Sequence, residues 1–196
     1  MKSFKPLFLI IGKSGSGKDY FVDEFCNNHR GFSKVLSYTT RQQRFPNENT
    51  HTFISKDEYR NLTDIVASTE FNGEYYCATR EMVELADFYI VDLDGALDFF
   101  GKFKNCFYGR EVYYLYLDIN PFKRFFRMVK RNSVKSAINR IINDRKVFKY
   151  IEYCCVNCPK RRFKKDSVIQ TKFMKMCKNK KVLEHEVLLT LSKCTI

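Results

Sequence analysis

The chain of 196 residues carries a formal net charge of +13, with 44% hydrophobic and 16% aromatic residues. This length is typical of one domain whose hydrophobic core is large enough to be stable without disulfide bonds or a structural metal ion. No apolar run approaches the roughly 18 residues of a membrane-spanning helix, which argues against a membrane-embedded protein. The apolar stretch at 7–11 leads into a glycine-rich turn and not into a cleavage site, so we expect a cytoplasmic protein that is not exported.

The positive charge is concentrated near the C-terminal end. Residues 121–181 contain 20 of the 35 Lys and Arg residues but only 3 of the 22 Asp and Glu residues. Such a block attracts phosphate groups, either those of a nucleotide or those of a polymer. Basic residues interleaved with Phe163 and Phe173 could bind a nucleic-acid strand, although we favour a solvated face combined with a nucleotide-binding flap.

Apolar runs and turn signals alternate in the rhythm of strands separated by helices. The pattern predicts strands at 7–11, 34–37, 65–69, 75–78, 88–93, 112–117 and 168–170. Helices are predicted to begin at residues 18, 56, 80, 96 and 121; the last of these continues, interrupted, past Asn132, and a final helix spans 181–192. Ser55 with Glu58 three residues later predicts a capping box. The order indicates an α/β fold in three layers, with a mostly parallel central sheet whose ligands gather at the carboxyl ends of the strands.

A glycine-rich turn follows the first strand. Gly12, Gly17 and Lys18 have the G-x-x-x-x-G-K spacing of a phosphate-binding P-loop, which predicts a P-loop NTPase fold. The glycines let backbone N–H groups point inward, and the N-terminus of the next helix adds partial positive charge. Lys18 supplies a full charge where the β- and γ-phosphates would lie. We therefore predict an ATP site made by Gly12, Ser14, Gly15, Ser16, Gly17, Lys18 and Asp19.

Carboxylates accompany this turn. Asp19 stands where a P-loop usually has Ser or Thr as a magnesium ligand, and its hard oxygens suit Mg²⁺ directly or through water. Asp92 and Asp94 end an apolar strand and would lie at the carboxyl edge of the sheet, where P-loop enzymes hold magnesium. We predict that Asp19 and Asp92 hold Mg²⁺ together with ATP.

Arginines gather in two further segments. Arg41 and Arg44 lie beside hydroxyl groups and can converge on one dianionic phosphate, unless this is simply a solvated polar loop. The spacing of the arginines in the second segment does not place them on one face of a single helix. It favours a flap of two helices joined by a turn, which closes over the phosphoryl group that is transferred. A solvated basic face is the alternative for this group, which comprises Arg124, Arg127, Arg131, Arg140 and Arg145.

The eight cysteines are scattered along the chain. Cys155 and Cys158 form one C-x-x-C pair, to which Cys177 could add a third zinc ligand. A second close pair is missing, so we favour free thiols over a metal site.

The order of P-loop, S-x-T-T-R-x-x-R, tyrosine pair, strand-end aspartate and arginine-bearing flap resembles the guanylate kinases. The resemblance covers roughly residues 5–170, and its most specific pieces are Gly12–Lys18 and Ser37–Arg44. It implies a single domain over 1–196, with a core (1–36, 80–125 and 146–196), an NMP-binding region (37–79) and a lid (126–145).

The resemblance also implies an activity, the ATP-dependent, magnesium-assisted phosphorylation of a nucleoside monophosphate (NMP). His51 replaces a phosphate-binding tyrosine of the family and would make binding more dependent on pH. The acceptor would be bound by Ser37, Arg41, Arg44, His51, Glu70, Tyr76 and Asp94. Catalysis would depend on Lys18, Arg41, Arg131 and Arg140.

The chain departs from the family where the base is recognised. Aligning on Gly73 and Tyr76 places Ala67 and Ala78 where the family reads guanine with a glutamate and a serine. Neither alanine can hydrogen-bond a base, so the guanine preference is not implied, and GMP, dGMP or another (deoxy)nucleoside monophosphate stays open as the acceptor. Two other functions remain alternatives: a non-catalytic guanylate kinase-like binding module, against which Lys18 argues, and a nucleic-acid-directed P-loop kinase.

Overall fold

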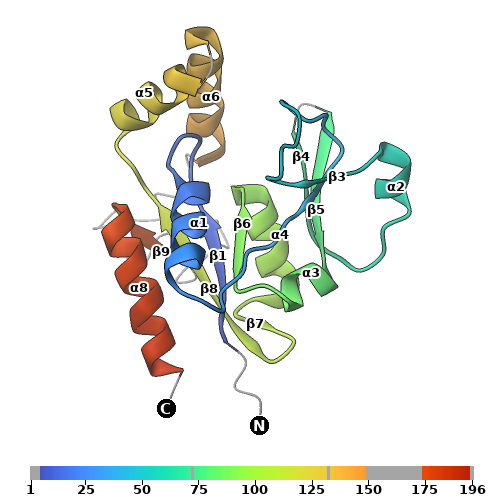
Figure 1. Cartoon of the computed structure of the whole chain (residues 1–196), viewed down its shortest axis with the longest axis vertical. Helices are drawn as coiled ribbons and strands as arrows, with labels where there is room; N and C mark the ends of the chain where they lie inside the picture. The colour runs from blue at the N-terminus through green and yellow to red at the C-terminus, as the bar shows by residue number, and fades with distance from the viewer. Residues whose placement is uncertain (1–4, 72, 132, 149–173, 195–196) are drawn as a thin grey trace, which may run out of the picture.

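The computed structural model describes residues 5–71, 73–131, 133–148 and 174–194. Its centre is a sheet in the order β6-β1-β8, with β1 parallel to both neighbours (Figure 1). Strand β8 also pairs with β9 in parallel orientation and with β7 in antiparallel orientation. The five strands are β1 (Leu7–Ile11), β6 (Phe88–Val91), β7 (Cys106–Phe107), β8 (Arg110–Leu117) and β9 (Met174–Cys177). The expected three-layer α/β fold with a mostly parallel sheet is confirmed.

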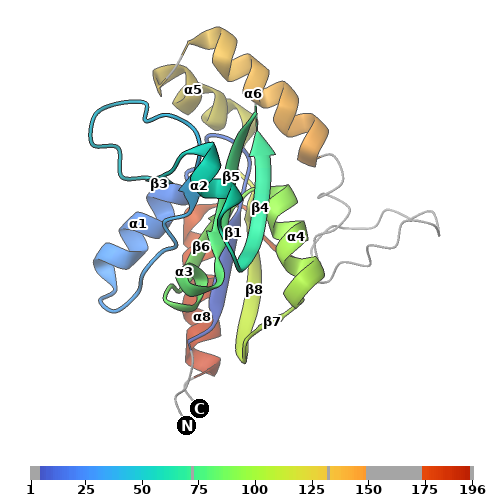
Figure 2. The same cartoon turned by 90° about the vertical axis from the view of Figure 1, so that its right-hand side faces the viewer.

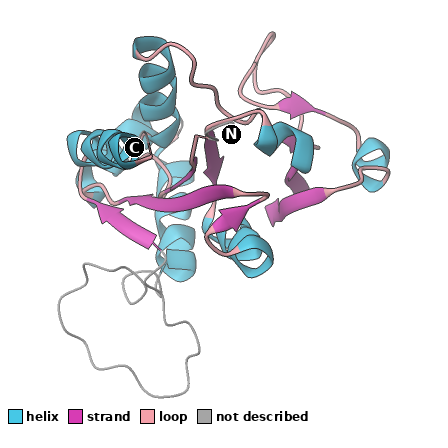
Figure 3. Ribbon diagram, turned by 90° about the horizontal axis from the view of Figure 1, so that it is seen from below, coloured by secondary structure: helices cyan, strands magenta, loops and turns pink. Residues whose placement is uncertain are grey.

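Helices cover both faces of this sheet (Figure 3). In β1, Phe8 and Ile10 point to one face because successive side chains of a strand alternate; they pack against α1 (Lys18–Asn28) and α8 (Lys180–Lys193). Leu7, Leu9 and Ile11 point to the opposite face and pack with α3 (Arg80–Glu84) and α4 (Leu93–Phe103). All five residues of β1 are fully buried, which fixes the position of the turn that follows it.

A second, four-stranded sheet stands beside the core, as Figures 1 and 2 show from two sides. Its order is β3-β2-β5-β4, and it is built entirely from residues between Tyr38 and Thr79. The strands are β2 (Tyr38–Thr39), β3 (Thr52–Phe53), β4 (Ile65–Phe71) and β5 (Glu74–Thr79). The short helix α2 (Lys56–Arg60) begins with the predicted capping box of Ser55 and Glu58.

Two helices lie over the turn that follows β1 (Figure 1). They are α5 (Pro121–Arg131), which starts with the proline that suits a first helical position, and α6 (Val134–Val147). Ser133 caps α6 by accepting a hydrogen bond from the N–H of Ser136 at 3.3 Å. The expected interruption of this helical segment is confirmed, because one helix ends at Arg131 and the next begins at Val134. We call α5 and α6 the lid helices.

Several predicted boundaries were wrong. Residues 34–37 form only an isolated bridge, between Lys34 and Phe88, and no strand. The fourth helix begins at Leu93 and not at Ala96, because the Asp92 carboxylate caps it by accepting a hydrogen bond from Gly95 N at 2.8 Å. The predicted strand 168–170 lies outside the described residues. Among the described segments, no helix is both long and apolar enough to cross a bilayer.

The described cysteines (Cys26, Cys77, Cys106, Cys177 and Cys194) have free thiols. Within the same described ranges, no group of three or more His, Cys, Asp or Glu side chains comes together as a metal site. Cys155 and Cys158 lie outside those ranges, so the alternative of a zinc site there stays a prediction.

Candidate active site

A cavity of about 330 Å³ opens between the P-loop, the second sheet and the lid helices. Residues from all three parts line it, although they are separated by up to 136 positions in the sequence. The cavity brings together most of the predicted site residues, namely Gly12, Ser14, Lys18, Asp19, Ser37, Arg44, His51, Glu70, Tyr76, Asp92, Asp94 and Arg140. Arg41 and Arg131, which were predicted to act in catalysis, do not line it.

Two glycines of the P-loop adopt backbone conformations that other residues rarely take. Gly15 has φ of 73° and Gly17, which precedes α1, has φ of 89°. A Cβ on Gly15 would also lie 2.9 Å from the carbonyl oxygen of Arg124, so α5 packs directly on this turn. The Ser16 hydroxyl is buried and has no hydrogen-bond partner among the described residues. The turn thus presents an unsatisfied polar group beside the predicted phosphate position.

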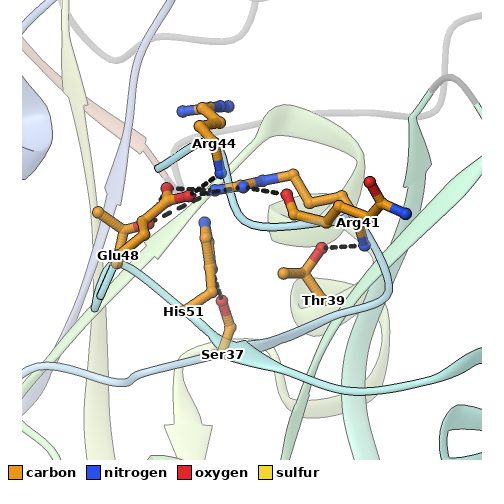
Figure 4. Close-up of polar contacts among 8 residues, drawn as sticks. Ser37, Thr39, Arg41, Arg44, Glu48 and His51 are labelled. Atoms are coloured by element: carbon orange, nitrogen blue, oxygen red, sulfur yellow. Dashed lines mark hydrogen bonds and ion pairs between the residues drawn. The ribbon is translucent and has the colours of Figure 1, made fainter. Parts of the chain in front are cut away.

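A second polar cluster lies across the cavity. The Ser37 hydroxyl is 2.9 Å from Nδ1 of His51 (Figure 4). The rings of His51 and Tyr76 meet edge to face, with their centroids 5.6 Å apart. Burial, and next the positive charge of Arg41, lower the pKa of His51 below its usual value. His51 is therefore neutral at pH 7 and can still gain a proton when an anion approaches.

Glu48 organises the arginines of this cluster (Figure 4). Its carboxylate receives hydrogen bonds from Arg41 at 2.6 and 2.9 Å and from the backbone N–H of Arg44 at 2.8 Å. Thr50 donates a further hydrogen bond at 2.7 Å. The bond from Arg41 holds the pKa of Glu48 far below its usual range. This role of Glu48 was not predicted, although its spacing of four positions from Arg44 and seven from Arg41 is a signal present in the sequence.

The two arginines of the cluster have different positions. Arg41 is held behind the cavity by Glu48, and its buried Nε has no hydrogen-bond partner among the described residues. Arg44 lines the cavity, and partial desolvation, then Arg41, and more weakly Arg140, lower the pKa of Arg44. This positive potential favours an anion between Arg44 and Arg140.

The arginines of the lid helices are also divided. Arg140 of α6 lines the cavity, whereas Arg131 is exposed near the end of α5. Arg127 donates hydrogen bonds from Nη1 to the carbonyl oxygens of Gly15 at 3.3 Å and Ser16 at 3.0 Å. The structure thus brings Arg140 and Arg127 to the P-loop region but not Arg131, whose catalytic role stays a prediction.

Comparison with known proteins agrees with this arrangement. No family model matches the chain. The guanylate kinase of Cupriavidus metallidurans is 31% identical over 83 residues, and that of Neisseria gonorrhoeae is 34% identical over 82 residues. The crystal structure of guanylate kinase from Anaplasma phagocytophilum superposes with a TM-score of 0.58 at 13% identity, covering 100% of this chain and 89% of that one. The chain thus has the fold of this guanylate kinase, and part of its sequence is similar to the two curated guanylate kinases.

The likeness in sequence is partial. The matches to the curated relatives cover 40% and 39% of this chain, and only 38% and 40% of the relatives' own lengths. The likeness to the solved structure, in contrast, extends over the whole chain and shows its fold.

One end of the cavity lies next to β4 and β5. Ala67 and Ala78 are direct cross-strand partners and are 1% and 0% exposed, within the core. Glu70 and Asp94, which were predicted to bind the acceptor, both line the cavity. The polar side chains that line this end thus include the carboxylates of Glu70 and Asp94 and the hydroxyl groups of Ser68 and Thr69.

Proposed function

We propose that this chain is an ATP-dependent nucleoside monophosphate kinase. The observation that carries the proposal is one shared cavity, lined by the P-loop, by the polar cluster of Ser37, Arg44, His51 and Tyr76, and by Arg140 of the lid. A protein that only binds a nucleotide at its P-loop has no need for the second cluster. The names of the sequence relatives and of the structural neighbour support the same reaction class.

The proposed reaction needs little covalent chemistry from the protein. The P-loop and Lys18 would bind the donor's phosphates, while Ser37, Arg44 and Tyr76 would hold the acceptor's phosphate in line with the γ-phosphoryl group. Arg140 would neutralise charge that develops on the transferred group. Positioning and electrostatic stabilisation supply nearly all the catalysis in phosphoryl transfer, so no general base is required.

The carboxylates present fit a magnesium ion. Asp19 and Asp92 both line the cavity near Lys18, and Mg²⁺ is usually bound by one or two carboxylates together with substrate phosphates, not by a cage of protein ligands. When bound, the ion would neutralise charge on the β- and γ-phosphates. We therefore assign Asp19 and Asp92 as its protein contacts.

The acceptor base is not assigned. Ala67 and Ala78 offer no hydrogen bond at the positions where guanylate kinases read guanine, so we do not restrict the acceptor to GMP or dGMP. The remaining carboxylates of Glu70 and Asp94 can accept hydrogen bonds from a base.

A coupled assay of ADP release, run with each ribo- and deoxynucleoside monophosphate in turn, tests the proposed function. We expect magnesium-dependent turnover with at least one acceptor, and the rank order of kcat/KM identifies the base. Absence of turnover with every acceptor would refute the proposal.

His51→Phe is expected to reduce the pH dependence of acceptor binding. The pKa of His51 is lowered in the free protein, and a bound phosphate raises it, so binding takes up a proton. The affinity of the wild-type chain then increases as the pH falls from 8 to 6.5, by a factor of up to about ten per pH unit. Calorimetric titration with the acceptor at several pH values measures this slope. His185→Phe, on the exposed side of α8, is the control; equal slopes in all three proteins would contradict the role of His51.

Asp19→Ser is expected to raise the Mg²⁺ concentration for half-maximal activity by about tenfold, because a neutral hydroxyl replaces a charged oxygen ligand. Magnesium titrations at saturating nucleotide measure the change. Asp23→Ser provides the control, since Asp23 lies farther along α1 and pairs with Lys34. Unchanged turnover and magnesium dependence in Asp19→Ser would exclude a ligand role.

A further inference from the structure

Two buried charges of the lid helices have no part in the proposed reaction. Arg124 of α5 is 3% exposed and Asp144 of α6 is 8% exposed. They form an ion pair with each other. Charged side chains are rarely buried unless their hydrogen bonds are satisfied, so the other contacts of this pair show what it does.

Both members of the pair also bind Ser14 of the P-loop. The Ser14 backbone N–H donates to Oδ2 of Asp144 at 3.0 Å, and its hydroxyl donates to Oδ1 at 3.2 Å. Arg124 donates from Nε to the Ser14 carbonyl oxygen at 2.9 Å. All the polar groups of Ser14 are thus engaged by the two lid helices. We call Ser14, Arg124 and Asp144 the lid anchor.

The neighbouring contacts fix the same docking. The backbone of Arg124 packs so closely on Gly15 that a Cβ there would lie 2.9 Å from its oxygen, and Arg127 binds the next two carbonyl groups. Asp144 lies four residues after Arg140, which places both side chains on one face of α6. Both line the cavity. Because Asp144 of α6 is bound to the P-loop, its contacts fix where Arg140 lies relative to the phosphates of the donor.

We propose that Asp144 is a positioning residue, which fastens α6 to the P-loop through Ser14, with Arg124 as its counter-ion, and so places Arg140 at the phosphate end of the cavity. The role in turnover rests on the proposed kinase function. The docking itself does not, because it depends only on contacts within the chain.

A double variant tests the anchor without leaving an unpaired buried charge. Arg124→Leu with Asp144→Ala removes both charges, whereas replacement of Asp144 alone would leave the Arg124 guanidinium buried without a partner. Asp144→Asn serves as a second variant, since its amide oxygen still accepts a hydrogen bond from Ser14. The matched control is Glu24→Gln with Lys180→Met, which removes an ion pair between α1 and α8.

Two measurements apply to each protein: kcat and KM in the coupled assay, and hydrogen exchange of the Ser14 amide by NMR in the nucleotide-free protein. In the double variant we expect a 10- to 100-fold lower kcat, acceptor KM within about threefold, and Ser14 exchange at least tenfold faster. We expect Asp144→Asn to lie between the double variant and the wild type, and the control to match the wild type.

Three results would overturn the inference. Unchanged Ser14 exchange in the double variant would show that Asp144 does not fasten the P-loop, and unchanged kcat would show that it does not position Arg140. Tighter ATP binding by the double variant with unchanged kcat would show that the Asp144 carboxylate repels the ATP phosphates and does not position Arg140. An inactive wild-type chain would refute the proposed function instead, and Ser14 exchange would still decide the docking.

Discussion

Lys18→Met is expected to lower kcat by about 10²- to 10³-fold, the usual effect of removing one preorganised group that stabilises transition-state charge. Lys18 begins α1 and lines the cavity. Burial raises the pKa values of Asp92 and Asp144, and the charge of Lys18 is close enough to oppose this effect in part. Methionine has a similar length, so the substitution removes the charge with little change in packing. Steady-state kinetics at saturating ATP measure the effect.

Lys175→Met is the control for this prediction. Lys175 lies on β9, is exposed and pairs with Glu186, so its loss is expected to change kcat by less than twofold. A Lys18→Met protein that retains more than a tenth of the wild-type kcat would contradict the assigned role. Thermal unfolding of both variants separates a loss of charge from a loss of folded protein.

Glu48→Ala is expected to lower the free energy of unfolding by about 3 kcal/mol, because it leaves Arg41 buried without a counter-charge. The Glu48 and Arg41 side chains are 1% and 10% exposed, so water compensates little for the lost pair. The same variant removes the hydrogen bond that orients the backbone of Arg44, so we also expect a higher KM for the acceptor. Urea denaturation and the coupled assay measure these two effects.

The stability effect of Glu48 has a defined pH dependence. The pKa of Glu48 is lowered in the folded state, so its contribution is fully present above the ordinary glutamate value of about 4.3 and is lost as the pH falls through the lower folded value. The difference between wild type and Glu48→Ala should therefore be constant from pH 5 to 8 and shrink only in stronger acid. Glu84→Ala breaks an exposed pair with Arg80 and should cost less than about 1 kcal/mol. Equal losses in the two variants would contradict the argument.

Much of the fold follows from local patterns in the sequence. The run of five apolar residues before Gly12 predicted β1 with its observed bounds, and Pro121 marked the start of α5. The two-residue strands β3 and β7 could not be predicted, because so short a segment shows no alternation. They form where a neighbouring strand offers free backbone groups, which is a property of the tertiary structure.

Local motifs of the candidate site could be predicted from the sequence, whereas side-chain pairs between distant residues could not. The P-loop and Arg44 were found because their chemistry is local, with the residues needed standing a few positions apart. The pairing of Arg124 with Asp144 was not found, because the two are 20 positions apart on different helices and meet only when the helices pack. Likewise Arg41 was predicted to be a phosphate ligand, because its pairing with Glu48 forms only when the loop between them folds.

The buried pair of Ala67 and Ala78 constrains how the proposed base site could change in evolution. Because Ala67 and Ala78 face each other in register and are fully packed, a glutamate alone at position 67 would bury a carboxylate without its serine partner. A serine alone at position 78 would provide a single hydroxyl group, which discriminates poorly between bases. A route between a guanine-reading site and the present one therefore passes through single mutants that are destabilised or unselective. Lineages of this type are expected to change both positions together, or neither.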